Sequence, residues 1–173
     1  MVIATFENIE LDNIYNRSIT MGKEIERKYI VSEDIDLDKY TFSIIEQGYL
    51  STDPDKTVRI RVKDDHAFIT IKGRNKGIER EEFEYKIPVL EAKQMLEMTP
   101  HKISKRRYYI QHHGHLWELD IFEGENSGLR MAEIELNSSN ETFSTPPWAI
   151  EEVSEDPRYF NSQLCLHPFS KWE

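Results

Sequence analysis

The chain has 173 residues, of which 38% are hydrophobic and 31% charged, and its formal net charge is −10. This length suits one domain with a core of its own, and an aromatic content of 11% argues against a disordered chain. An acidic domain without a basic footprint is not expected to bind a nucleic acid polymer, and no apolar run approaches the roughly 20 residues that a membrane span requires.

The amino-terminal residues 1–20 show no clear periodicity and contain acids at Glu7, Glu10 and Asp12. These acids interrupt any apolar stretch, so the segment does not resemble a secretory signal peptide. The sequence leaves open whether it is an added extension, a short capping helix or a stretch ahead of an internal translation start. We therefore divide the chain into an extension of unknown role, residues 1–20, and one domain, residues 21–173.

From Glu24 onwards, charged and apolar residues alternate, which is the period of a β-strand. Turn signals such as Asp53-Pro54-Asp55 separate the alternating segments, and short turns between consecutive strands imply antiparallel pairing. Eight strands are expected, at residues 23–31, 42–51, 57–64, 67–73, 79–87, 103–113, 115–122 and 131–138. They predict a closed barrel, because closure removes exposed sheet edges.

Two helices are expected beside the strands. The first covers residues 89–98 and ends before Pro100, because proline cannot continue a helix. The second begins at Asp156-Pro157, where Asp156 is a candidate N-cap, and extends to about residue 166. The predicted fold class is thus mainly β within an α+β domain: an eight-stranded antiparallel barrel flanked by helices.

Each strand carries charged side chains on one face and apolar side chains on the other, because residues two apart point to the same side. An ordinary sheet turns its apolar face inward and leaves the charges in water. Here the charged faces contain little serine, threonine, asparagine or glutamine, and acids and bases are sorted onto different strands. This composition favours a barrel with charges lining the interior and helices covering the apolar outer face. Charges so confined must be paired or hold a ligand.

Taken in chain order, the charged segments resemble the signature of the CYTH domain, or triphosphate tunnel metalloenzyme, family. The first strand has the motif Glu-x-Glu-x-Lys at Glu24, Glu26 and Lys28. The similarity covers about residues 21–170 and continues through Gln47-Gly48-Tyr49-Leu50, Val58-Arg59-Ile60-Arg61, Thr70-Ile71-Lys72-Gly73, Arg80-x-Glu82-x-Glu84, Lys105-x-Arg107, Glu118-x-Asp120-x-Phe122 and Glu133-x-Glu135. One such motif is common on surface strands, whereas eight in the same order are specific.

The resemblance implies an eight-stranded tunnel that binds a linear triphosphate together with Mg²⁺ or Mn²⁺. Arginine binds two phosphate oxygens at once and lysine is a compact positive charge; the substrate-binding residues are expected to be Lys28, Arg59, Arg61, Lys72, Arg80, Lys105 and Arg107. Hard divalent cations prefer carboxylates; the expected metal ligands are Glu24, Glu26, Asp120, Glu133 and Glu135, with Glu118 as a further candidate. The expected catalytic residues are Glu24, Glu26, Lys28, Glu133 and Glu135.

The activity implied by the resemblance is metal-dependent hydrolysis of inorganic triphosphate, a cleavage of a phosphoric anhydride in which a metal-activated water attacks the terminal phosphorus. Other members of the family hydrolyse thiamine triphosphate, nucleoside triphosphates or RNA 5′-triphosphates, and some are class IV adenylyl cyclases. No adenine or thiamine pocket is recognisable in the sequence, which favours the inorganic substrate. A non-catalytic polyphosphate-binding module is the alternative from another class, but both acidic pairs of a catalyst are intact. Glu82 and Glu84 could orient water or an arginine, or form a structural ion pair.

Other suggestive residues have simpler explanations. His112, His113 and His115 surround a tight turn, where three imidazoles cannot readily converge on one zinc ion. Cys165 is the single cysteine, so no internal disulfide forms and a cytoplasmic location is expected; the residue itself is expected in the core. Tyr49 is expected to serve packing. The expected partner is a small triphosphate rather than a nucleic acid or a membrane, and the oligomeric state stays open, a homodimer included.

Overall fold

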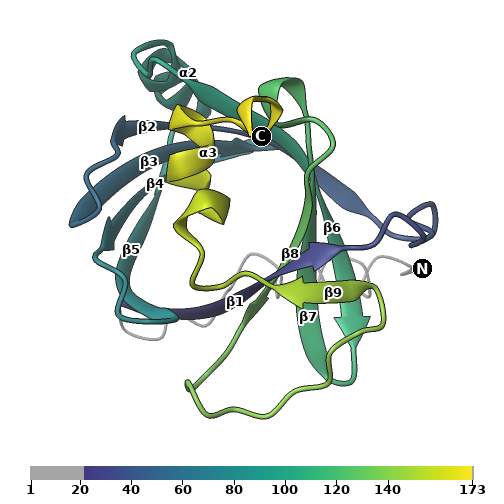
Figure 1. The fold of residues 1–173 in the computed structure, drawn as a ribbon. Helices are drawn as coiled ribbons and strands as arrows, with labels where there is room; N and C mark the ends of the chain where they lie inside the picture. Colours follow the sequence, from purple (N-terminus) through teal and green to yellow (C-terminus); the bar gives the residue numbers. More distant parts are fainter. Residues whose placement is uncertain (1–21, 173) are drawn as a thin grey trace, which may run out of the picture.

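A computed structural model describes residues 22–172 as a closed antiparallel β-barrel (Figure 1). The sheet has the strand order β5-β4-β3-β2-β6-β7-β8-β1-β9, and an additional pairing between β5 and β1 closes the barrel. The strands are β1 (Lys23–Val31), β2 (Phe42–Ser51), β3 (Lys56–Lys63), β4 (His66–Gly73), β5 (Glu79–Ile87), β6 (Lys102–His112), β7 (His115–Phe122), β8 (Arg130–Glu135) and β9 (Ala149–Glu152). The extension expected over residues 1–20 lies outside the described residues.

The predicted barrel of eight antiparallel strands is confirmed, and the largest difference in strand length is at β8. This strand ends at Glu135, three residues before the predicted end. The ninth strand, β9, is absent from the prediction and pairs with the end of β1, where Tyr29 lies opposite Glu152. Four residues are too few for an alternating pattern to be recognised, so only the pairing reveals this strand.

Strand β1 closes the barrel because it pairs with three other strands. Its first residues pair with β5, from Lys23 opposite Glu81 to Ile25 opposite Glu79. Its last residues pair with β9, and β8 pairs along its middle. The acidic and basic side chains of β1 therefore lie between those of β5 and β8.

The first predicted helix is present as α2 (Val89–Glu97), which begins after Pro88. It covers the outer face of β3 and β4, where the side chains of Ala92 and Leu96 are buried in one apolar cluster with Ile60, Val62 and Ala67. This packing confirms that a helix covers part of the apolar outer face of the barrel.

The second predicted helix is wrong in two respects. Asp156 does cap its start, accepting a hydrogen bond from the backbone N–H of Arg158 at 3.0 Å, but the segment is divided into the 3₁₀ turn η2 (Pro157–Tyr159) and the helix α3 (Asn161–Leu166). Phe160 separates them in an extended conformation, with φ −72° and ψ 133°. Moreover, α3 does not cover the outer face; it lies across one end of the barrel (Figure 1).

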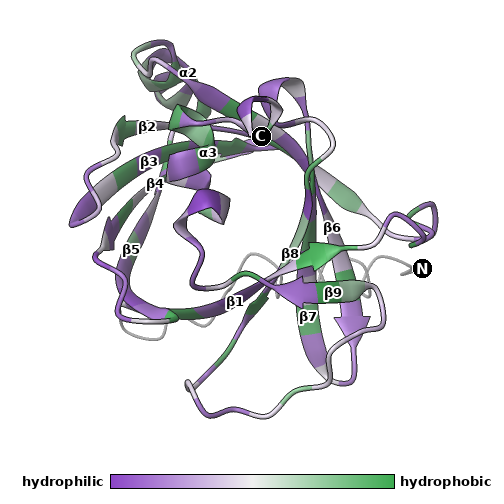
Figure 2. Cartoon of the chain, viewed as in Figure 1, coloured by the Kyte–Doolittle hydropathy of each residue, from purple (hydrophilic) through white to green (hydrophobic). Residues whose placement is uncertain are grey.

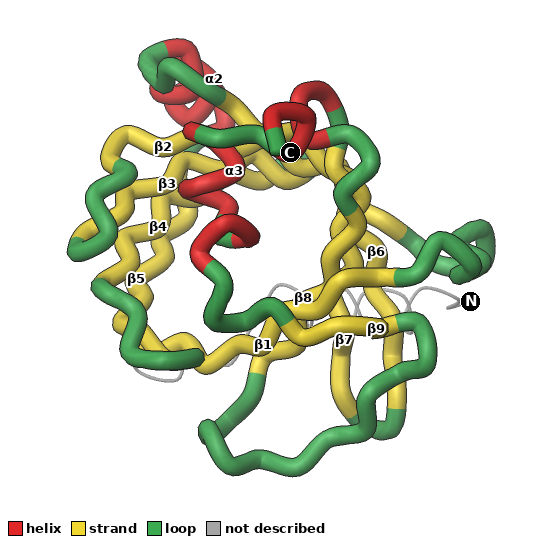
Figure 3. The backbone as a smooth tube through the Cα atoms, in the orientation of Figure 1, coloured by secondary structure: helices red, strands yellow, loops and turns green. Residues whose placement is uncertain are grey.

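The apolar residues form clusters on both sides of the barrel wall, and Figure 2 shows hydrophobic residues interspersed with hydrophilic ones along the strands. Outside the wall, Trp117, Leu119 and Ile134 are fully buried beneath Phe143 and Trp148 of the long connection between β8 and β9 (Figure 3). A second cluster lies inside the end of the barrel that α3 closes; its buried members are Tyr49, Ile103, Phe122, Leu129, Met131, Leu164 and Cys165. The interior is therefore charged over part of its length and apolar at this end.

Two short 3₁₀ turns complete the described chain, η1 (Gly124–Asn126) and η3 (Phe169–Lys171). Asn126 joins them to α3, because its side chain accepts a hydrogen bond from the backbone N–H of Phe169 at 2.8 Å and donates one to the carbonyl of Leu164 at 3.4 Å. Among residues 22–172, no helix is long and apolar enough to cross a bilayer.

Candidate active site

The charged faces of the strands point into the barrel, as the composition predicts. Most of their acids and bases are buried although they are ionisable; the buried ones are Glu24, Lys28, Arg59, Arg61, Lys63, Lys72, Lys105, Arg107, Glu118, Asp120 and Glu133. Alternation in each strand places these side chains on the inner side, and the opposite, apolar residues on the outer side. The ordinary arrangement, with charges in water, is thereby excluded.

A cavity of about 500 Å³, a volume that includes open solvent at its mouth, lies among these charges. Predicted site residues form most of its wall; they are Glu24, Glu26, Lys28, Arg59, Arg61, Lys72, Arg80, Arg107 and Glu133. Tyr49, Thr57, Phe160, Asn161 and Ser162 complete the wall. The structure thus brings residues from distant strands, together with the C-terminal segment, around one space.

Three predicted site residues do not line this cavity. Lys105 and Asp120 are 2% and 1% exposed and bind each other, with Lys105 Nζ 2.6 Å from Asp120 Oδ2. They form a layer behind Arg107, whose guanidinium donates to both oxygens of Asp120 at 2.7 and 2.6 Å. The third, Glu135, lies opposite Glu26 in the register of β1 and β8.

One group of ion pairs joins β1 to β4 and β5. Lys72 Nζ lies 2.8 Å from Glu24 Oε1, and Arg80 Nε lies 2.5 Å from Glu24 Oε2. Arg80 also reaches Glu26, with Nη2 3.0 Å from Oε1. Burial by itself would raise the pKa of Glu24, but the charges of Arg80 and Lys72 outweigh it and hold that pKa well below its ordinary value. Glu24 is therefore an anion at neutral pH.

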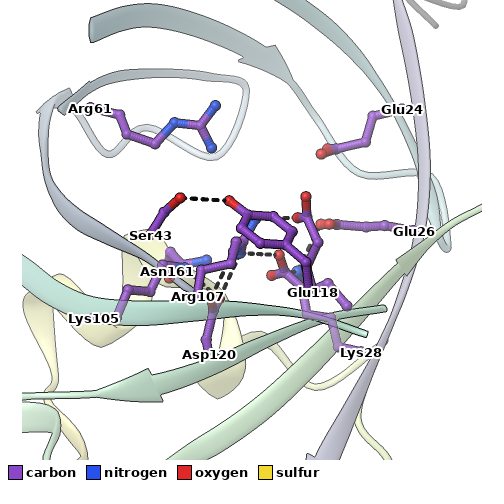
Figure 4. Close-up of polar contacts among 12 residues, drawn as sticks. Glu24, Glu26, Lys28, Ser43, Arg61, Lys105, Arg107, Glu118, Asp120 and Asn161 are labelled. Atoms are coloured by element: carbon purple, nitrogen blue, oxygen red, sulfur yellow. Dashed lines mark hydrogen bonds and ion pairs between the residues drawn. The ribbon is translucent and has the colours of Figure 1, made fainter. Parts of the chain in front are cut away.

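A second group joins β1 to β6 and β8. Lys28 Nζ lies 2.8 Å from Glu26 Oε1 and 2.6 Å from Glu133 Oε1, and Arg107 Nη2 lies 2.7 Å from Glu133 Oε2. Burial opposes the charge of Glu133, yet Lys28 and Arg107 lower its pKa well below the ordinary value. Burial likewise opposes the charge of Lys28, while Glu133 and Glu26 raise its pKa. Since Glu26 contacts both Arg80 and Lys28, the two groups form one continuous alternation of acids and bases. Figure 4 shows Glu24, Glu26, Lys28 and Arg107 of these groups.

Glu84 holds the two arginines of β3 from the neighbouring side of the barrel. Its carboxylate lies 2.9 Å from Arg61 Nη2 and 3.2 Å from Arg59 Nη2, and it accepts a hydrogen bond from the hydroxyl of Thr70 at 2.7 Å. Glu82 instead pairs with Lys72 at 2.9 Å. The sequence left open whether Glu82 and Glu84 orient a water or an arginine or form structural ion pairs. Their contacts favour a role in holding the basic side chains in place.

The carboxylates of the cavity fit a hard divalent cation by their chemistry. Within residues 22–172, no three acid, histidine or cysteine side chains converge as a ready-made metal site. Mg²⁺, however, is commonly held by one or two carboxylates together with phosphate oxygens and water, rather than by a cage made entirely of protein. Glu24, Glu26 and Glu133 can supply such carboxylates at the cavity wall.

The remaining side chains considered from sequence lie mostly where they are expected. His113, at the turn between β6 and β7, is exposed and has a positive φ of 47°. Cys165 is a buried residue of α3 and belongs to the apolar cluster at that end of the barrel, and burial raises the pKa of its thiol to about 11. Tyr49 packs in that cluster, as expected, and its side chain also lines the cavity.

Sequence reasoning overlooked the contribution of the C-terminal segment. Phe160, Asn161 and Ser162 line the cavity, and Asn161 Oδ1 accepts a hydrogen bond from Lys105 Nζ at 3.3 Å. No motif or alternating pattern marks these residues, because they precede and begin a short helix that reaches the site only after the barrel has closed.

Comparisons with a family model, with protein sequences and with solved structures agree on one family. A family model for the CYTH domain matches residues 22–163. An inorganic triphosphatase of Acetivibrio thermocellus is 47% identical over 155 residues, which cover 88% of this chain and 99% of that protein. An inorganic triphosphatase of Nitrosomonas europaea is 36% identical over 148 residues, covering 83% and 97%. The crystal structure of an inorganic triphosphatase, 35% identical, superimposes with a TM-score of 0.61 over 83% of this chain and 94% of that chain.

Proposed function

The chain belongs to the CYTH domain family, and from this premise we propose that it hydrolyses inorganic triphosphate with the help of bound Mg²⁺ or Mn²⁺. The observation that carries the proposal is the charge of the cavity. Its wall contains six basic side chains, Lys28, Arg59, Arg61, Lys72, Arg80 and Arg107, and three acidic ones, Glu24, Glu26 and Glu133. A protein with a net charge of −10 thus concentrates positive charge in one enclosed space, which suits a small polyanion.

The relatives support inorganic triphosphate as the substrate. Proteins that are 47% and 36% identical over most of this chain are inorganic triphosphatases. The charged side chains that line the cavity suit a small polyanion such as free triphosphate rather than a polymer. The lone cysteine supports a cytoplasmic location for the enzyme.

In the proposed reaction, the basic side chains bind and orient the triphosphate. Glu84 holds Arg59 and Arg61 in place before substrate arrives, so little side-chain entropy is lost on binding. Phosphate oxygens take over part of the hydrogen bonds of Lys28 and Arg80, which makes carboxylate oxygens of Glu24 and Glu26 available. The proposal assigns the metal to these two acids and to Glu133.

Hydrolysis adds a water to the terminal phosphorus and breaks its bond to the bridging oxygen, releasing phosphate and pyrophosphate. A bound divalent ion supplies charge neutralisation and a water of lowered pKa. The cations of the cavity stabilise the negative charge that develops on the leaving pyrophosphate, as in other phosphoryl transfers. The buried wall keeps bulk water away from these charges and so strengthens their action.

The test is phosphate release from inorganic triphosphate, ATP and thiamine triphosphate, each with Mg²⁺, Mn²⁺ or EDTA. We expect fastest release from inorganic triphosphate and none in EDTA. In the double variant Glu24→Gln/Glu26→Gln, metal-dependent release should fall by about 100-fold or more, because two carboxylates with metal-ligand chemistry are lost. Full activity in this variant would refute the proposed metal ligands, and formation of cyclic AMP from ATP in place of phosphate would refute the proposed reaction.

A further inference from the structure

The C-terminal segment is the part of the cavity wall to which no role has been assigned. Three consecutive residues, Phe160, Asn161 and Ser162, line the cavity. They are held there by apolar packing, because Leu164 is fully buried among Ile103, Phe122 and other residues inside the barrel. The segment is therefore fixed at the cavity and is able to present a polar group in a defined place.

Asn161 presents such a group. Its Oδ1 accepts a hydrogen bond from Lys105 Nζ at 3.3 Å, and Lys105 is itself fixed by Asp120 at 2.6 Å. Since a lysine ammonium has only donors, the amide must turn its oxygen toward Lys105 and its NH₂ group away from it. Figure 4 shows Asn161 beside Lys105 and Arg107.

The side-chain hydrogen bond of Asn161 is made through its oxygen. Its NH₂ group donates no hydrogen bond to any of residues 22–172. The side chain is half-buried and lines the cavity, so its two amide donors adjoin the space between the basic residues. A neutral donor of this kind suits a phosphate oxygen, because hydrogen bonds to charged acceptors are stronger than those between neutral groups.

We propose that Asn161 is a substrate-binding residue whose side-chain Nδ2 donates a hydrogen bond to a phosphate oxygen of inorganic triphosphate. The inference rests on the proposed function and extends it, because it makes α3 part of the active site as well as the closure of the barrel end. Lys105 holds the amide in the donating orientation, and the packing of Leu164 holds α3 at the cavity.

The isosteric variant Asn161→Asp separates this role from a purely structural one. Aspartate keeps an oxygen that accepts from Lys105 but replaces the NH₂ donors by a second, negatively charged oxygen. We expect Asn161→Ala to raise KM for triphosphate about tenfold, through loss of one hydrogen bond to a charged group. Asn161→Asp should raise it further, about 100-fold, because its carboxylate repels phosphate.

If Asn161 served only to position Lys105, the aspartate variant would retain the wild-type KM while the alanine variant lost activity. That result would overturn the inference, and so would an unchanged KM in both variants. Gln163→Ala is the matched control, because Gln163 lies in the same helix and does not line the cavity; its KM should equal that of the wild type.

Calorimetric titration of inorganic triphosphate into the proteins in EDTA gives a second readout that does not depend on catalysis. Binding should weaken in the order wild type, Asn161→Ala, Asn161→Asp, and thermal unfolding should confirm that both variants fold. Equal binding by all three proteins would overturn the inference while leaving the proposed function intact. A wild-type protein that neither binds nor hydrolyses triphosphate would overturn both.

Discussion

At the scale of single residues, neighbours in the sequence have opposite environments. Arg106 and Arg107 are adjacent in β6, yet Arg106 pairs with Glu123 at the surface, whereas Arg107 is 5% exposed and binds buried carboxylates. Asp120 and Glu133 are two of these carboxylates, and Glu118 is a third contact. The charge of an arginine in β6 therefore does not predict its contribution to stability. That contribution depends on whether the side chain lies on the inner or the outer face of the strand.

The two adjacent arginines provide a matched pair of substitutions. Arg107→Ala should lower the free energy of unfolding by about 3–5 kcal/mol, because it leaves buried carboxylates without their cation. Arg106→Ala removes an exposed ion pair and an exposed contact with the Phe42 ring and should change the free energy of unfolding by about 1 kcal/mol at most. Urea denaturation of both variants measures the difference. Equal losses would show that the inner ion pairs are not desolvated as the structure indicates.

At the scale of elements, close packing between α2 and the barrel depends on a residue without a side chain. The backbone of Gly48 in β2 faces the end of α2, and a Cβ at this position would lie 2.9 Å from Thr99 Cβ. Thr99 is buried and its hydroxyl donates to the carbonyl of Leu96 at 2.7 Å. Thr99 is therefore not free to move aside. Position 48 requires glycine because the C-terminal end of α2 packs closely against β2 there.

Alanine substitutions at two strand glycines test this packing. Gly48→Ala should lower the free energy of unfolding by about 1–3 kcal/mol, the usual cost of overpacking. Gly73→Ala is the control, since its Cβ would meet the side chain of Glu81 at an ordinary 3.4 Å. Thermal or urea unfolding should separate the two. A Gly48 variant as stable as the Gly73 variant would indicate that α2 shifts without cost.

At the scale of the whole molecule, the family match and the described barrel begin at the same point in the chain. The family match begins at residue 22, where the described barrel also begins, and the described residues that line the cavity lie between Glu24 and Ser162. The two curated relatives are covered over 99% and 97% of their own length, so the matched region corresponds to nearly all of each relative.

Removal of residues 1–20 is therefore expected to leave the fold and the site unchanged. A chain of residues 21–173 should keep cooperative thermal unfolding and the wild-type kcat and KM for inorganic triphosphate. The measurement is a direct comparison of the two proteins in Mg²⁺. A loss of activity or of cooperative unfolding in the shorter protein would show that the extension contributes to the domain.

The sequence by itself determined eight of the nine strands and the family, and it favoured the inward direction of the charges. These are local or ordered features: alternation follows from the backbone geometry of a strand, and motifs such as Glu24-x-Glu26-x-Lys28 can be recognised in their order along the chain. Only the tertiary structure decided which charges from different strands meet, because the pairing of β1 with β5 and β8 brings Glu26 to Arg80 and Lys28 to Glu133.

The same physical reason explains the features that sequence reasoning missed. Lys105 has the inward direction of a site residue, but its ammonium is engaged by Asp120 behind the cavity wall, a contact between strands that periodicity does not contain. Asn161 enters the wall because Leu164 is buried inside the barrel end. A strand pattern records which side a residue faces; its partners depend on segments that are distant in sequence and meet only in the folded chain.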